Sequence, residues 1–68
     1  MFKVGDIVKY KKEWCSEDEL KYRHIVREIR LNPVTDEMSR YLIETINTSL
    51  SLNPTETVDG FMIEKAAG

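Results

Sequence analysis

The fold of this chain is decided by Tyr22-Arg23-His24-Ile25-Val26-Arg27-Glu28-Ile29-Arg30-Leu31, because this stretch fits two different structures. As a helix, it gathers apolar side chains on one face at the i, i+3, i+4 and i+7 spacing: Tyr22, Ile25, Val26 and Ile29. Ser16-Glu17-Asp18-Glu19 before it has the pattern of a capping box, and Asn32-Pro33 would end the helix. As a strand, the stretch has a weaker period, with Ile25, Arg27, Ile29 and Leu31 on one face. Local periodicity alone favours a helix.

The residues that follow favour a strand instead. Residues 32–39 form a polar loop of the length that joins antiparallel neighbours. The loop leads into Arg40-Tyr41-Leu42-Ile43-Glu44-Thr45-Ile46-Asn47, which is rich in β-branched and aromatic residues and alternates between two faces. A helix at 22–31 would leave this strand short of partners. We therefore predict a long hairpin of 22–31 and 40–47, with Ser16–Glu19 as a polar loop or one short helical turn. The alternative is an α+β fold with one helix at 16–31.

Both ends of the chain also indicate strands. Gly5 can adopt positive φ and Asp6 can brace the turn, after which Ile7 to Lys12 alternate between two faces. Near the C-terminus, the Asp59-Gly60 turn separates Glu56–Val58 from Met62–Lys65. The prediction is a mainly β, five-stranded antiparallel domain over residues 1–68. Its expected core is Val4, Ile7, Val8, Ile25, Ile29, Leu42, Ile43, Ile46, Val58, Phe61 and Ile63.

Length and composition indicate one small globular domain. The chain has 68 residues, of which 41% are hydrophobic and 32% charged. No run approaches the roughly 18 apolar residues that span a bilayer, and no leader pattern opens the chain, so we expect no membrane partner. A single cysteine, Cys15, excludes an internal disulfide and favours a reducing, cytoplasmic location. A domain this small gains from strand closure or from a second copy of itself.

With these residues identified, a resemblance follows. Val4-Gly5-Asp6-Ile7-Val8-Lys9-Tyr10 resembles the first strand of Src homology 3-like barrels of the Tudor and KOW sort. Glu56-Thr57-Val58-Asp59-Gly60-Phe61-Met62-Ile63-Glu64 is similar to the strand, helical turn and final strand that close such barrels. The resemblance implies a small five-stranded barrel. The whole chain also resembles short uncharacterised bacterial or mobile-element proteins, which implies no activity.

Aromatic residues are the first candidates for a binding site. Barrels of this kind bind methylated side chains in aromatic cages and proline-rich peptides on rows of aromatics. The candidates here do not map residue by residue onto such a cage. We expect a protein or peptide partner, including a second copy, at a surface made of Tyr10, Trp14, Tyr22 and Tyr41. For Trp14 the alternative is a core plug at the end of the barrel.

Basic residues interleaved with these aromatics suggest a second hypothesis, nucleic-acid binding. The residues are Lys9, Lys11, Lys12, Lys21, Arg23 and Arg27, with aromatic rings to stack on bases. The net charge of −2 and a pI near 5.3 oppose it, because affinity for phosphates is mainly electrostatic. The sequence therefore favours protein interaction.

Catalysis and metal binding are not indicated. Cys15 and His24 could pair as nucleophile and base, but no orienting group or oxyanion site is marked. One cysteine and one histidine cannot close a tetrahedral metal site. With three glycines and no phosphate loop, we expect no cofactor. Cys15 is then a small buried hydrophobe and His24 a half-buried strand residue.

Overall fold

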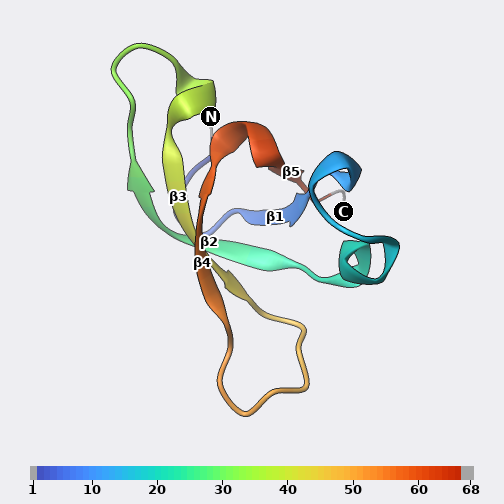
Figure 1. Cartoon of the computed structure of the whole chain (residues 1–68). Helices are drawn as coiled ribbons and strands as arrows, with labels where there is room; N and C mark the ends of the chain where they lie inside the picture. The colour runs from blue at the N-terminus through green and yellow to red at the C-terminus, as the bar shows by residue number, and fades with distance from the viewer. Residues whose placement is uncertain (1, 67–68) are drawn as a thin grey trace.

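The computed structural model describes residues 2–66, apart from the side chain of Asp36. Within this range lie five strands: β1 (Ile7–Tyr10), β2 (His24–Arg30), β3 (Arg40–Thr45), β4 (Thr55–Asp59) and β5 (Ile63–Lys65). Short 3-10 helices lie between them: η1 (Lys12–Trp14), η2 (Glu17–Lys21), η3 (Asp36–Met38) and η4 (Gly60–Met62). The strands form one antiparallel sheet in the order β4-β3-β2-β1-β5 (Figure 1). The prediction of a mainly β, five-stranded antiparallel fold is confirmed.

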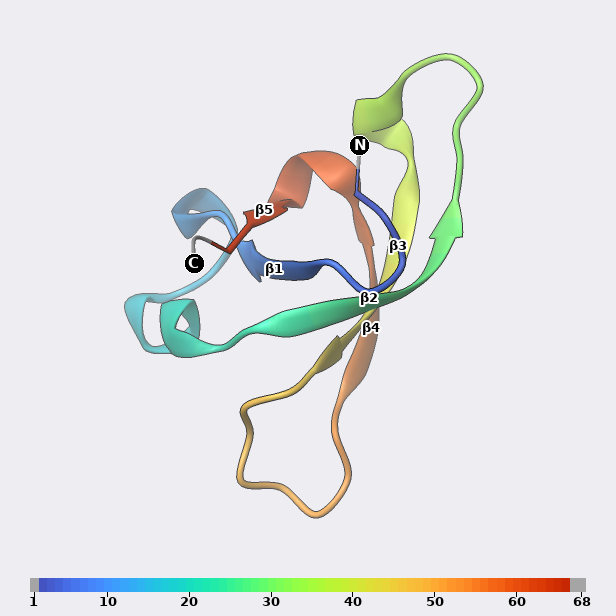
Figure 2. The same ribbon diagram turned by 180° about the vertical axis from the view of Figure 1, so that it is seen from behind.

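The contested stretch is a strand. β2 pairs with β3 from His24 opposite Thr45 to Arg30 opposite Arg40, so the predicted hairpin is confirmed. The helical alternative over 16–31 is wrong, because only Glu17–Lys21 coil and Tyr22 is already extended, with φ −76° and ψ 146°. Pairing with strands on both edges of β2 outweighs the local helical period. The two hairpin loops, 31–39 and 46–54, extend from opposite ends of the sheet (Figure 2).

A β-bulge in β2 changes which residues face the core. The register with β3 shifts between Val26 and Glu28, so Arg27 is the extra residue. Before the bulge His24 and Val26 are buried, and after it Ile29 packs against the core. Strict alternation therefore fails across β2. This explains why the apolar residues of the strand do not fit a period of two.

The core is smaller than the sequence predicts. Its buried hydrophobic residues are Val8, Val26, Tyr41, Ile43, Val58 and Ile63. The side chains packed around them include Phe2, Tyr10, Ile29 and Met62. The prediction was wrong for three residues on the surface: Val4, Ile7 and Ile46. Val4 lies in the turn before Gly5, Ile7 takes the outward side of β1, and Ile46 follows the end of β3. Ile25, Leu42 and Phe61 are only partly buried.

The turn that opens the chain has the predicted glycine conformation. Gly5 has φ 95°, and its N–H donates to the Val26 carbonyl at 2.9 Å. The Asp6 carboxylate accepts the Lys3 N–H at 2.8 Å, while the Asp6 carbonyl accepts the Val26 N–H at 3.0 Å. These bonds attach the turn to β2 and start β1 in register.

The sheet is strongly coiled, and β4 and β5 are its two edges. Among the described residues these edges do not pair with each other; η4 connects them through the chain. The Tyr10 hydroxyl of β1 donates to the Glu56 carboxylate of β4, so a side-chain bond spans the inner face of the sheet. None of the helices in this part of the chain is long and apolar enough to cross a membrane.

Candidate functional site

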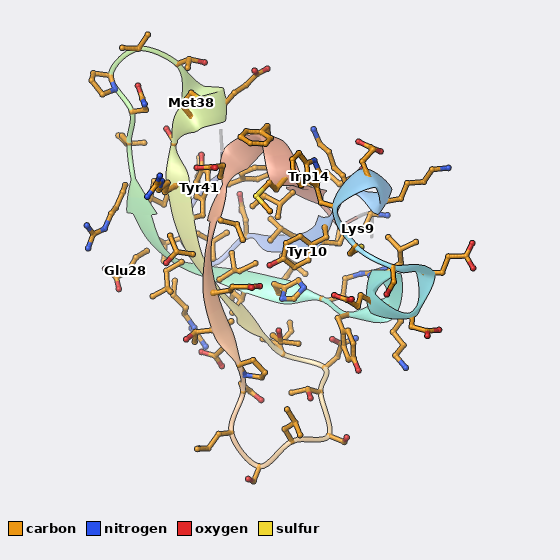
Figure 3. All side chains as sticks on the ribbon, viewed as in Figure 1. Lys9, Tyr10, Trp14, Glu28, Met38 and Tyr41 are labelled. Atoms are coloured by element: carbon orange, nitrogen blue, oxygen red, sulfur yellow. The ribbon has the colours of Figure 1, made fainter. Side chains whose placement is uncertain are left out.

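Trp14 is the most exposed large aromatic of the predicted site. It ends η1, the turn that follows β1, and its backbone N–H donates to the Lys11 carbonyl at 2.9 Å. The Lys11 N–H in turn donates to the Met62 carbonyl of η4 at 3.0 Å. The Trp14 side chain, labelled in Figure 3, lies edge-on to Phe61, with ring centroids 5.3 Å apart. The residue is 48% exposed. Trp14 is therefore a positioned surface residue and does not plug the core.

Tyr10 precedes Trp14 by one short turn of the chain but belongs to a polar cluster on the inner face of the sheet. Its ring is edge-on to His24, with centroids 5.1 Å apart, and its hydroxyl binds Glu56. Burial and the Glu56 carboxylate raise the pKa of Tyr10 well above its ordinary value, so the phenol stays a hydrogen-bond donor. Tyr10 thus offers only part of its ring to a ligand.

His24 is the buried centre of the same cluster. Its Nδ1 lies 3.0 Å from the Thr45 hydroxyl, and its buried Nε2 has no hydrogen-bond partner among the described residues. Burial lowers the pKa of His24, outweighing the opposing effect of Glu56, and Arg23 lowers it further. The neutral imidazole therefore serves packing and is shielded from solvent.

Cys15 is not paired with His24 as a nucleophile would be. Its Sγ lies 3.7 Å from the Lys11 carbonyl as a weak donor. Burial, with a contribution from the Glu19 carboxylate, raises the pKa of the Cys15 thiol, which disfavours the thiolate. Among the side chains that the structure describes, no group of three or more from His, Cys, Asp and Glu could hold a metal ion.

The remaining two tyrosines of the predicted site lie in different environments. Tyr22 follows η2, is half-buried, and has the Lys21 ammonium 5.4 Å from its ring centroid. Tyr41 is only 1% exposed and lies edge-on to Phe2 at 5.2 Å between centroids. Tyr41 is therefore a core residue that no surface ligand can reach. Its inward position follows from the alternation of β3, which puts Tyr41 and Ile43 on one face.

Several basic residues of the nucleic-acid hypothesis are already engaged. Arg27 Nε lies 3.0 Å from Glu44 Oε1, and hydrogen bonds from Asn53 and Arg27 lower the pKa of Glu44. The Arg23 guanidinium donates to the carbonyls of Leu20 and Tyr22 at 2.8 and 3.1 Å. Lys9 stands opposite Glu64 in the β1–β5 ladder. The other basic residues of this hypothesis lie close in the chain to exposed acidic residues of η2. The basic residues are Lys11, Lys12 and Lys21, and the acidic ones are Glu17, Asp18 and Glu19.

Sequence reasoning missed a hollow on the outer face of the sheet. It measures about 470 Å³ and is lined by Glu28, Arg30, Arg40, Leu42 and Thr57. Arg30 and Arg40 are direct cross-strand neighbours, and Arg40 Nε lies 3.3 Å from Asp59 Oδ1. Alternation in β3 indicates the outward position of Arg40. The place of Arg30 depends on the bulge, which the sequence does not mark.

The chain was compared with protein families, curated proteins and solved structures. No family model, no curated protein and no solved structure matches the chain.

Proposed function

We propose that this chain is a non-enzymatic protein-interaction module that binds a protein or peptide partner at its Trp14 surface. This surface consists of Trp14 and Phe61, with Tyr22 and the outer part of Tyr10 as further candidate contacts. One observation carries the proposal: Trp14 is held against Phe61 yet remains 48% exposed. A small domain gains stability by burying its tryptophan, so a fixed and exposed one favours a binding role. Such anchored aromatic residues supply much of the binding energy at protein interfaces.

The architecture proposed for the module is a Src homology 3-like barrel of the Tudor or KOW sort. Two features support it: the single turn η4 between β4 and β5, and the long hairpin of β2 and β3. The Tyr10–Glu56 hydrogen bond adds a link across the inner face from β1 to β4. The single cysteine supports the cytoplasmic location expected from the sequence.

Protein interaction is preferred to nucleic-acid binding on electrostatic grounds. Glu44 neutralises Arg27, and Arg23 is engaged by backbone carbonyls. The chain carries a net charge of −2, whereas phosphate binding releases counterions in proportion to the free basic groups that contact the backbone.

A peptide-display selection tests the proposal. Peptides selected on the wild-type protein are measured against Trp14→Ala and against Val34→Ala, which truncates an exposed apolar residue on the 31–39 loop. We expect Trp14→Ala to weaken binding at least about tenfold, a loss of about 1.4 kcal/mol, and Val34→Ala to leave it unchanged. Circular dichroism checks that both variants fold.

Two results would contradict the proposal. Equal binding of the selected peptides by wild type and Trp14→Ala would show that the peptides do not bind at the Trp14 surface. Failure to select peptides, together with oligonucleotide binding that weakens steeply with salt, would support a nucleic-acid module instead.

A further inference from the structure

The β4 edge of the sheet has free backbone groups. In the part of the chain that the structure describes, β4 has one neighbouring strand, β3. The bonds Thr45 N–H to Pro54 carbonyl at 2.9 Å and Gly60 N–H to Ser39 carbonyl at 2.8 Å identify the hydrogen-bonded pairs of this ladder. Because such pairs alternate, Glu56 and Val58 bond to β3, whereas Thr55 and Thr57 direct their N–H and C=O groups away from it.

This edge lacks several of the features that usually prevent strand addition. β4 spans five residues, Thr55-Glu56-Thr57-Val58-Asp59, without proline, glycine or lysine, and its ladder with β3 has no bulge. Threonine and valine favour extended structure. The opposite edge, β5, is only three residues long and carries Lys65. The two edges of one sheet thus differ in how well they are protected.

Both acidic residues of β4 have partners within the same chain, and for Asp59 the partner is a cation. Glu56 binds the Tyr10 hydroxyl across the inner face. Asp59 lies 3.3 Å from the Arg40 guanidinium. Space is also open beside the strand, where a hollow of about 300 Å³ is lined by Arg40, Thr57, Val58, Asp59 and Met62. Among the described residues, no further strand covers this edge of β4.

We propose that a second copy of this chain pairs with this edge, β4 against β4 in antiparallel orientation, so that two five-stranded sheets become one continuous sheet. The occupant is a second copy because the edge is complementary to itself. With the two-fold axis at Thr57, that residue faces the partner's Thr57, and Thr55 faces the partner's Asp59. Of the two registers one step away, the one centred on Glu56 would oppose two carboxylates, which is unfavourable. The one centred on Val58 would pair only residues 57–59 of each strand.

The same register also joins apolar groups. Antiparallel pairing brings the loop before β4 of one copy toward η4 of the other. That loop carries Leu52, which is 82% exposed, and η4 ends at the partly buried Met62. The interface therefore combines backbone hydrogen bonds at its centre with apolar contact at both ends. This pairing rests on the proposed interaction function, because it names one partner for the module. The β4 interface is nevertheless a different surface from that of Trp14.

Sedimentation equilibrium of the full chain tests the pairing with three substitutions of Thr57. Thr57→Pro removes the outward N–H, and Thr57→Lys places two like charges at the two-fold axis. Thr57→Val keeps the N–H and the strand preference, and serves as the matched control. We expect the wild-type protein and the Thr57→Val variant each to form a dimer. In Thr57→Lys and Thr57→Pro, the dissociation constant of the dimer should rise at least about 100-fold. Far-UV circular dichroism verifies the fold, and Thr57→Lys decides the matter if Thr57→Pro does not fold.

A wild-type protein that stays monomeric up to about 1 mM would overturn the pairing, as would dimers of undiminished strength in the folded Thr57→Lys variant. Trp14→Ala separates this outcome from the proposed function. If Trp14→Ala abolishes dimerisation while Thr57→Lys does not, self-association uses the Trp14 surface and the β4 pairing is wrong. If Thr57→Lys is monomeric but binds selected peptides normally, both proposals stand.

Discussion

Two buried polar side chains, Ser39 and His24, are accommodated differently. Ser39 is fully buried, and its hydroxyl accepts the Asn32 N–H at 3.0 Å, while its carbonyl accepts the Gly60 N–H. His24 is bonded through Nδ1 to Thr45, but its Nε2 has no partner among the described residues. Ser39 therefore connects the 31–39 loop to η4 with its side-chain oxygen paired, whereas His24 makes the core sensitive to protonation.

This sensitivity gives a prediction at the residue scale. Because burial lowers the pKa of His24 in the folded state, the unfolded chain binds the proton more tightly. The contribution of His24 to the free energy of unfolding is present above the unfolded pKa of 6.5 and is lost as the pH falls from there through the lowered folded value. Urea denaturation at several pH values should show this loss in wild type and a shallower dependence in His24→Gln. Identical pH dependence in the two proteins would contradict the assignment.

At the scale of elements, β3 carries the centre of the core. It is paired on both sides, with β2 and β4, and Ile43 is 1% exposed on its inward face. Ile43→Ala should lower the free energy of unfolding by about 2–5 kcal/mol through lost burial and the cavity left behind. Leu42→Ala, on the outward face of the same strand, is the matched control and should cost clearly less. Equilibrium denaturation measures both, and equal losses would mean that the faces of β3 are misassigned.

The sequence predicts these elements better than it predicts faces and sites. The expected core correctly includes Val8 and Ile43, but it also includes Ile7 and Leu42 from the opposite faces of the same strands. The bulge at Arg27 lies between Val26 and Ile29 and has no local sequence signal, so alternation could not predict that both residues face the core. The sequence likewise does not show whether Tyr41 belongs to the core or to a binding surface, because a tyrosine is common in both. Its position is determined by its neighbours in the fold, such as Phe2. The position of Trp14 likewise involves Phe61, which is distant in the sequence but lies edge-on to the indole.

At the scale of the whole molecule, Tyr10 and Glu56 connect strands that are not neighbours in the sheet. Their hydrogen bond joins β1 to β4 across the inner face, where no backbone ladder runs in the described part of the chain. Tyr10→Phe keeps the edge-on contact with His24 but removes this bond. We expect the free energy of unfolding to fall by about 1 kcal/mol, measured by thermal or urea denaturation. An unchanged stability would mean that the coiled sheet does not depend on this link.

The proposed function depends on a partner binding at the surface around Trp14. Its most direct test is NMR: the spectrum of the ¹⁵N-labelled protein is followed while a peptide selected on the wild-type protein is added. The largest shifts should fall on the Trp14 indole N–H and on the backbone amides of η1 and η4. Shifts confined to the outer-face hollow around Arg30 and Arg40, with the indole signal unmoved, would contradict the account.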